Sequence, residues 1–160
     1  MSALYVHIPF CQHICTYCDF CKVFYNEKWA WQYLDALAFE IQQKQLSHDY
    51  KTIYIGGGTP TALTYEQLQY LFELLKPYAR HCQEWSMEMN PETMNHEKLE
   101  LCVQNGVNRL SIGVQTFHNH LLKKIGRVHT CEQVKSFILE AQNKGVQDIN
   151  IDLMYGLPEQ

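Results

Sequence analysis

Three cysteines near the N-terminus have the spacing of a metal or cluster site. Cys11, Cys15 and Cys18 form a C-x3-C-x2-C pattern directly after a β-branched and aromatic run, residues 4–8, which predicts a strand. Thiolates this close together on a loop are typical ligands of a metal ion or an iron–sulfur cluster. A [4Fe-4S] cluster held by only three cysteines keeps one iron open to a ligand that is not protein.

Two other ligand sets fit the same spacing. A structural zinc site has four closed ligands, and Cys21, His7 or His13 could supply the fourth. Cys21 could instead complete a four-cysteine cluster of the electron-transfer type. Disulfides are not expected, because the chain has seven cysteines, an odd number, and nothing in it indicates an oxidising compartment. The spacing alone leaves the open cluster, the zinc site and the closed cluster as alternatives.

The rest of the chain alternates predicted strands with amphipathic helices. Thr64 with Gln67 and Thr130 with Gln133 match the capping box that begins a helix. The predicted strands are residues 4–8, 52–55, 85–89, 109–114 and 149–154, and the predicted helices begin at about residues 27, 64, 95, 121 and 130, the first extending to residue 46. Regular alternation of strand and helix predicts an α/β fold with a parallel sheet and helices outside it.

Groups with chemical capability lie at the ends of these strands. Ligands of parallel α/β folds bind at the carboxyl ends of the strands, so these groups should converge on one site. Three glycines, residues 56–58, would let the backbone approach a ligand closely. Glu88 suits the hydroxyls of a ribose, and Arg127 suits a carboxylate. Gln115 and Asp152 are polar residues at the ends of otherwise apolar strands.

With Tyr17 before its last cysteine, the cysteine pattern resembles the signature of the radical S-adenosylmethionine (SAM) enzymes. The flanking YVHIPF and CDF resemble the oxygen-independent coproporphyrinogen III oxidase-like family, and the later motifs GGGTP, SMEMNPE, RLSIGVQTF, GRVH and NIDLMYGLP follow the same family in the same order. The resemblance therefore covers the whole chain. It implies a partial (β/α)6 radical SAM barrel of about five βα units, with the last strand and a C-terminal domain lying outside residues 1–160.

The resemblance also implies cofactors and the residues that bind them. Cys11, Cys15 and Cys18 would hold a [4Fe-4S] cluster whose open iron is chelated by SAM. By matching position, Tyr5, Gly57 and Glu88 would contact this SAM. In the oxidase, a further set of positions contacts SAM, and some of these contacts are with a second SAM molecule. The matching residues here are Tyr17, Gly58, Thr59, Gln115, Arg127 and Asp152. The zinc and closed-cluster alternatives require none of the later motifs.

One departure from the oxidase pattern separates two function classes. The oxidase carries a C-x-C pattern at its third cysteine, whereas this chain has Cys18-Asp19-Phe20. CDF resembles the HemW branch, whose members are heme chaperones, so heme is the expected cargo and a heme-acceptor protein the expected partner. The alternative is a radical SAM enzyme acting on coproporphyrinogen III or another porphyrinogen, and enzyme activity stays open. Cys21 lies one residue too late for the oxidase pattern and is expected not to be a ligand.

Charge and hydropathy exclude several other classes. The chain has 160 residues, 46% of them hydrophobic, and a net charge of −4, which gives no electrostatic reason to expect a nucleic-acid partner. No signal peptide is recognisable at the N-terminus. No apolar run approaches the ~20 residues that a transmembrane helix needs. We therefore expect a cytoplasmic protein without a transmembrane segment.

Overall fold

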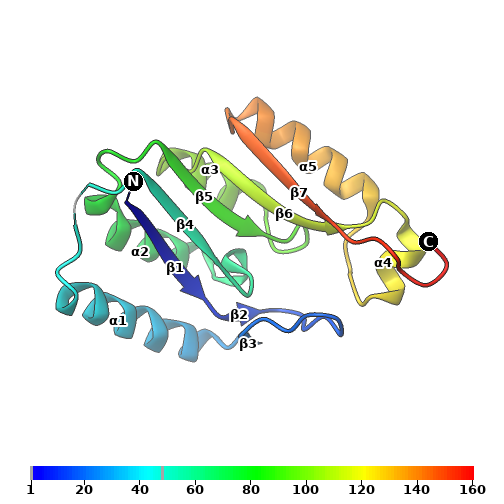
Figure 1. Ribbon diagram of the computed structural model, residues 1–160, viewed down its shortest axis with the longest axis horizontal. Coiled ribbons are helices and arrows are strands. Elements are labelled where there is room, and N and C mark those ends of the chain that lie inside the picture. The colour runs from blue at the N-terminus through cyan, green and yellow to red at the C-terminus, as the bar shows by residue number, and fades with distance from the viewer. Residues whose placement is uncertain (1, 48) are drawn as a thin grey trace.

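Five parallel strands form the centre of the protein. The computed structural model describes residues 2–47 and 49–160, and its main sheet has the strand order β1-β4-β5-β6-β7 (Figure 1). These strands are β1 (Ala3–Ile8), β4 (Thr52–Gly57), β5 (Glu84–Met89), β6 (Arg109–Gln115) and β7 (Asp148–Leu153). Every neighbouring pair in this sheet is parallel, which confirms the predicted α/β fold.

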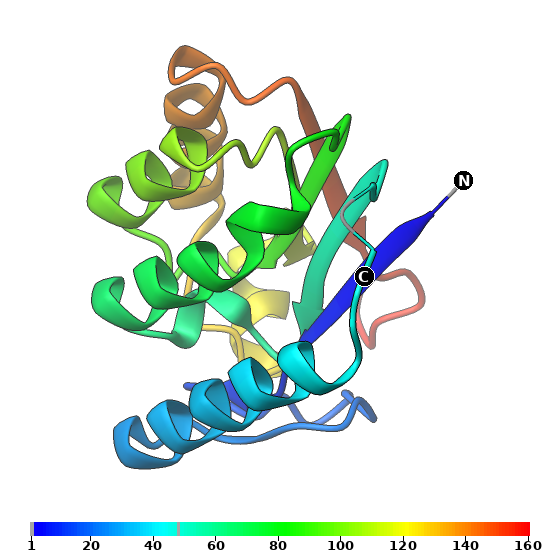
Figure 2. The same ribbon diagram turned by 90° about the vertical axis from the view of Figure 1, so that its left-hand side faces the viewer.

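The helices connect successive strands and cover one face of the sheet. They are α1 (Glu27–Gln43), α2 (Tyr65–Leu75), α3 (His96–Gln104), α4 (Asn119–Lys124) and α5 (Cys131–Asn143), with short 3-10 helices at Pro60–Ala62 and Lys76–Tyr78. Figure 2 shows these helices on one side of the strands, and the described residues place no helix on the opposite side. In the part of the chain that the structure describes, β7 is followed by no helix.

The hydrophobic core lies between the sheet and the helices. Side chains of a strand point alternately to the two faces of the sheet, so every second residue can be apolar. Ile53 and Ile55 of β4, Met87 of β5, and Leu110 and Ile112 of β6 are fully buried. They lie in register, with Ile55 opposite Met87 and Met87 opposite Leu110. These apolar side chains pack against the helices. The residues that alternate with them along each strand therefore point to the opposite face of the sheet.

The residues that alternate with the core set are polar and face the uncovered side of the sheet. Glu88 of β5 lies opposite Ser111 of β6, which lies opposite Asn150 of β7. Farther along, Gly113 of β6 lies opposite Asp152. Parallel sheets are usually buried on both faces and read as continuous apolar runs. Strands with this alternation therefore indicate a sheet face that is not covered by apolar packing.

Two helix starts are predicted correctly, and one helix end is wrong. The capping boxes at Thr64 and Thr130 are both present, with reciprocal side-chain and backbone hydrogen bonds. The first helix, expected to reach residue 46, ends at Gln43. Gln45 has a φ of 45°, a left-handed conformation that cannot continue an α-helix. No glycine marks this stop, so the end of the helix could not be placed from the residue types.

A second, very short sheet holds the two ends of the cysteine loop together. β2 (Phe10–Cys11) pairs in parallel with β3 (Val23–Phe24), just beyond the end of β1 (Figure 1). The N–H of Val23 donates to the carbonyl of Pro9 at 2.8 Å, and the N–H of Tyr25 donates to the carbonyl of Cys11 at 2.9 Å. Strands of two residues carry no periodicity, so the sequence did not predict this pair.

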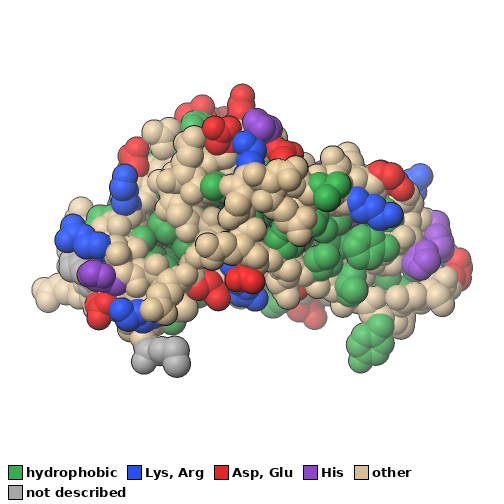
Figure 3. Space-filling view, turned by 90° about the horizontal axis from the view of Figure 1, so that it is seen from above, with side chains coloured by type: hydrophobic (Ala, Val, Ile, Leu, Met, Phe, Trp, Pro, Cys, Tyr) green, Lys and Arg blue, Asp and Glu red, His purple; other side chains and the backbone are tan. Residues whose placement is uncertain are grey.

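The surface view shows where apolar side chains remain uncovered. In Figure 3, hydrophobic side chains gather over the half of the molecule that holds the end of β7 and the C-terminus. Leu153 and Tyr155 there are largely exposed, Tyr155 at 95%. Among the described residues, none of the helices has the length and apolar character needed to cross a membrane. The cytoplasmic location and the further strand and domain stay predictions.

Candidate cluster and cofactor site

A cavity of about 610 Å³ lies between the cysteine loop and the carboxyl ends of the strands. This volume is within the usual range for a small-molecule or cofactor site. Most of the residues singled out in the sequence line it, namely Cys11, Cys15, Tyr17, Cys18, Gly57, Gly58, Thr59, Glu88, Gln115, Arg127 and Asp152. The structure thus brings residues from the loop and from four strand ends around one space.

Tyr5 is the exception among the predicted site residues, because it does not line the cavity. Its side chain is exposed, and its hydroxyl lies 2.9 Å from Nδ1 of His7. Its ring stacks on Tyr54 with the ring centroids 6.1 Å apart, and Tyr54 does line the cavity. A direct contact of Tyr5 with a ligand in this cavity therefore stays a prediction.

The glycine run joins β4 to the start of the cysteine loop. Beyond β4, the N–H of Gly58 donates to the carbonyl of Ile8 at 2.9 Å, and the N–H of Thr59 donates to the carbonyl of Phe10 at 2.8 Å. A Cβ on Gly58 would lie 2.9 Å from the carbonyl oxygen of Phe10 and 3.0 Å from Sγ of Cys11. This glycine is therefore required by the close approach of the cysteine loop, whatever binds in the cavity.

Gly57 is held in place by a carboxylate. Its φ is +119°, and a Cβ there would lie 2.7 Å from ring atoms of His7. Its N–H donates to Oε2 of Glu88 at 2.9 Å, while Oε1 of Glu88 accepts from the Tyr54 hydroxyl at 2.7 Å. Burial, together with this hydrogen bond and the carboxylate charge, raises the pKa of Tyr54. The phenol therefore stays protonated and keeps donating to Glu88.

Each of two cysteines of the motif has a polar neighbour from elsewhere in the chain. Sγ of Cys11 lies 3.5 Å from the hydroxyl of Thr59, and Nη1 of Arg127 lies 3.7 Å from Sγ of Cys15. Burial raises the pKa of Cys11, so the free thiol keeps its proton. Binding of a metal by this sulfur would release that proton, because metals bind the thiolate. Burial also raises the pKa of Tyr17 between Cys15 and Cys18.

The ligand geometry gives no support to the zinc alternatives. Zinc needs four ligands around one centre, at about 2.0–2.3 Å. Across residues 2–47 and 49–160, no three His, Cys, Asp or Glu side chains converge on one ion. Cys21 is exposed and lies outside the cavity, and the ring of His7 is engaged by Tyr5 and by the Cys21 carbonyl. His13 lines the cavity, but no three such side chains of the described residues, His13 included, converge on one ion. Thiolates that each bind a different iron of a cluster need no common centre.

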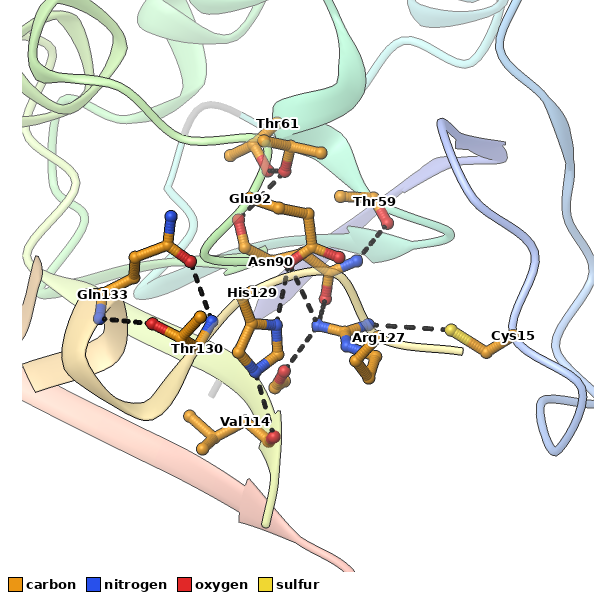
Figure 4. Close-up of polar contacts among 12 residues, drawn as sticks. Cys15, Thr59, Thr61, Asn90, Glu92, Val114, Arg127, His129, Thr130 and Gln133 are labelled. Atoms are coloured by element: carbon orange, nitrogen blue, oxygen red, sulfur yellow. Dashed lines mark hydrogen bonds and ion pairs between the residues drawn. The ribbon is translucent and has the colours of Figure 1, made fainter. Parts of the chain in front are cut away.

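Arg127 carries a buried donor without a partner. The residue is only 6% exposed, and its Nη2 donates to Oδ1 of Asn90 at 2.8 Å and to the carbonyl of Gly113 at 2.6 Å (Figure 4). Its Nε has no hydrogen-bond partner in the described protein. Buried polar atoms are almost always hydrogen bonded, so this N–H is an exception among the residues around the cavity.

Several site residues were missed at the sequence level. Asn90 joins two predicted residues, because its Nδ2 donates to the hydroxyl of Thr59 at 3.0 Å while its Oδ1 accepts from Arg127. Glu92 and His129 pack behind the same arginine. The strand-end rule could have found Asn90 and Glu92, which directly follow β5. The polar alternation of the strands could have found three further lining residues, Arg109, Ser111 and Asn150.

Gln115 has an unusual backbone conformation at the cavity. Its φ is 70°, and the register of β6 with β7 shifts between Gly113 and Gln115. Left-handed backbone at a non-glycine residue costs free energy and often occurs at functional sites. The bulge ends the ladder and leaves the Gln115 carbonyl to accept from the N–H of Met154 at 2.8 Å. The sequence predicted the residue but not this geometry.

Comparisons with known proteins agree with the geometry. Residues 5–160 match the Radical SAM superfamily. The chain is 47% identical to a protein named heme chaperone HemW of Bacillus subtilis, over 100% of this chain and 44% of that protein. It is 34% identical to an oxygen-independent coproporphyrinogen III oxidase of Pseudomonas aeruginosa, over 99% of this chain and 36% of that protein. The chain thus spans less than half the length of these curated relatives.

A solved structure gives the same answer for the fold. The structure of coproporphyrinogen III oxidase (HemN) from Escherichia coli, described as a radical SAM enzyme, matches with a TM-score of 0.88 and 34% identity. The match covers 99% of this chain and 38% of that one. With the family match over nearly the whole chain and the cysteine loop facing a cavity at the strand ends, this chain belongs to the Radical SAM superfamily.

Proposed function

We propose that Cys11, Cys15 and Cys18 hold a [4Fe-4S] cluster and that SAM binds in the adjoining cavity. The three cysteines line the same cavity as the glycine run and Arg127, whose buried Nε lacks a partner. A reduced cluster of this family supplies the electron that cleaves SAM. The chain's own residues bind the cofactor, orient it and shield it from water.

Each lining residue has a role that its chemistry suits. We assign the Gly57 and Gly58 backbone to the methionine part of SAM, and Glu88 to its ribose. Arg127 would donate through Nε to an acceptor such as a carboxylate. The remaining assigned contacts are Tyr5, Tyr17, Thr59, Gln115 and Asp152, by position in the family pattern. Glu88 keeps Gly57 in place through the 2.9 Å hydrogen bond, so it serves the loop as well as the ligand.

We further propose that the protein is a heme chaperone that binds heme and transfers it to an acceptor protein. The observation that carries this choice is Phe20, which stands where the oxidase pattern has a cysteine. Its side chain is 73% exposed, so this position offers an apolar surface and no thiol. The 47% identity to a heme chaperone over the whole chain supports the same choice.

The second candidate is a coproporphyrinogen III oxidase. It is favoured by the 34% identity to an enzyme of that name over 99% of the chain. Both candidates share the cluster and SAM, so these cofactors do not separate them. Heme binding and conversion of the porphyrinogen are the two properties that separate the candidates.

The test uses the anaerobically reconstituted protein in two assays. Titration with hemin should produce a saturable Soret band, and added apo-heme protein should then take up the heme. Incubation with coproporphyrinogen III, SAM and a reductant should leave the porphyrinogen unchanged by chromatography. Conversion of coproporphyrinogen III without saturable heme binding would reverse the assignment in favour of the oxidase.

A further inference from the structure

A buried acid–base pair, Glu92 and His129, lies directly behind the arginine of the cavity; the motifs SMEMNPE and GRVH end in these two residues, but the sequence assigned them no role. His129, between α4 and α5, is 3% exposed, and its Nδ1 lies 3.1 Å from Oε2 of Glu92, in the segment after β5 (Figure 4). Its Nε2 lies 3.3 Å from the carbonyl oxygen of Val114 in β6. The ring is thus fixed at both ends by groups from two other elements.

The partners of the ring determine its protonation. Both Oε2 of Glu92 and the carbonyl oxygen of Val114 accept hydrogen bonds, and a neutral imidazole has only one N–H to donate. The doubly protonated ring can donate to both acceptors, whereas either neutral tautomer leaves one of them without a donor. The carboxylate facing it is ionised: burial favours its neutral form, but the His129 hydrogen bond and the Arg127 charge outweigh burial and hold the pKa of Glu92 below its ordinary value.

The same carboxylate also faces the arginine. Oε2 of Glu92 lies 3.4 Å from Nη2 of Arg127, so one anion lies between two buried cations. The exposed fractions of the three side chains are 4% for Arg127, 0% for His129 and 11% for Glu92. Charges this deeply buried must be paired, because leaving one without its partner is strongly unfavourable. The arginine is held from behind while its Nη1 approaches Sγ of Cys15 at 3.7 Å.

We propose that Glu92 and the imidazolium of His129 are positioning residues that fix the guanidinium of Arg127 between the cysteine loop and the SAM cavity. This inference rests on the proposed cluster and SAM site for its functional consequence. Neither residue lines the cavity, so they act on a ligand only through Arg127. With Glu92 neutralised, two buried cations lose their common anion and the guanidinium moves from its place.

The first test needs no cluster. Nitrogen-15 NMR of the cluster-free chain should show a doubly protonated His129 ring at neutral pH and slow rotation of the Arg127 guanidinium. Glu92→Gln should release the guanidinium, whereas Glu132→Gln, which changes an exposed glutamate of α5 bonded to Asn119, should not. A neutral His129 ring, or a freely rotating guanidinium in the unchanged chain, would overturn the proposal whether or not a cluster binds.

The second test follows SAM binding by EPR of the reduced, reconstituted protein. Glu92→Gln should weaken the apparent affinity for SAM about tenfold, as other supporting residues of metal sites do. In an Arg127→Gln background the same change should have less than about a twofold effect, because the residue acts through the arginine. Equal effects in both backgrounds would indicate a merely structural role. A native cluster that ignores SAM would refute the proposed function, while the NMR result would still decide the positioning role.

Discussion

Nη1 of Arg127 lies 3.7 Å from Sγ of Cys15, although 112 positions separate the two residues in the sequence. Lysine at this position would keep the charge but lose the planar group that reaches Asn90, Gly113 and the loop at once. We expect Arg127→Lys to retain the cluster and to weaken the apparent affinity for SAM about tenfold, as measured from the SAM-dependent change of the EPR spectrum. Arg80→Lys, at an exposed arginine, should behave like the unchanged chain.

The ligand assignment is tested by single cysteine replacements. Alanine at Cys11, Cys15 or Cys18 should reduce bound iron and sulfide after reconstitution to near zero, because two thiolates leave a cluster under-coordinated. Cys21→Ala is the matched control, since Cys21 is exposed and outside the cavity. If the Cys21 variant alone lost the cluster, the three-cysteine assignment would be wrong.

Gly57→Ala and Gly145→Ala compare two glycines with left-handed backbone, at φ +119° and +90°. Only the first has a neighbour in the way, the His7 ring at 2.7 Å, while Gly145 has nothing within 4 Å. We expect Gly145→Ala to cost about 1–2 kcal/mol of unfolding free energy from the backbone alone. Gly57→Ala should cost more and should also remove the SAM response, because His7 and the loop must shift. Urea denaturation and EPR measure the two effects, and equal stability losses would contradict the steric argument.

Glu92 should make the stability of the chain depend on acid pH. Its pKa is lowered on folding, so the ionised form stabilises the fold above the unfolded value of about 4.5, and this contribution disappears as the pH falls through the lowered folded value. We expect the Glu92→Gln chain to be less stable at pH 7 and to lose less stability than the unchanged chain between pH 5 and pH 3. Urea denaturation across this range measures the difference. Parallel pH curves for the two chains would exclude Glu92 as a contributor.

Thiol alkylation should separate the cysteines by burial. Burial raises the pKa of Cys102 to about 12, and its side chain is fully inaccessible. At pH 8 this thiol is therefore almost entirely protonated and unreactive. Iodoacetamide should label the exposed Cys21 of the cluster-free folded chain well before Cys102, as peptide mass spectrometry would show. Early labelling of Cys102 would mean that α3 opens.

Periodic patterns explain why much of the fold was predictable. Leu68, Leu71, Phe72 and Leu75 repeat at helical spacing, and all four are fully buried in α2. The strand-end rule placed residues from separate motifs at one edge of the sheet, and most of them line the same cavity. These signals are local, since each depends on residues a few positions apart.

The unpredicted features depend on distant partners. Asn90 bonds Arg127 across 37 positions and Thr59 across 31, and no sequence period records such a pair. The left-handed Gln45 that ends α1 and the bulge at Gln115 occur without a glycine to announce them. Their conformations follow from packing against residues far away in the sequence, so no local pattern predicts them.

The pairing of β2 with β3 has a consequence for how the cysteine loop can vary. Closing a loop of roughly ten residues costs about 2 kcal/mol of chain entropy. Because the strand pair β2–β3 holds both ends of residues 12–22, this cost is met when the chain folds and not when a ligand binds. Phe20, the residue that departs from the oxidase pattern, lies 73% exposed inside this closed segment. A replacement there changes the surface around the cysteines and leaves the backbone that carries Cys11 where it is. A tethered loop of this kind lets related proteins differ in the surface that they present to a partner while keeping the same three cysteines in place.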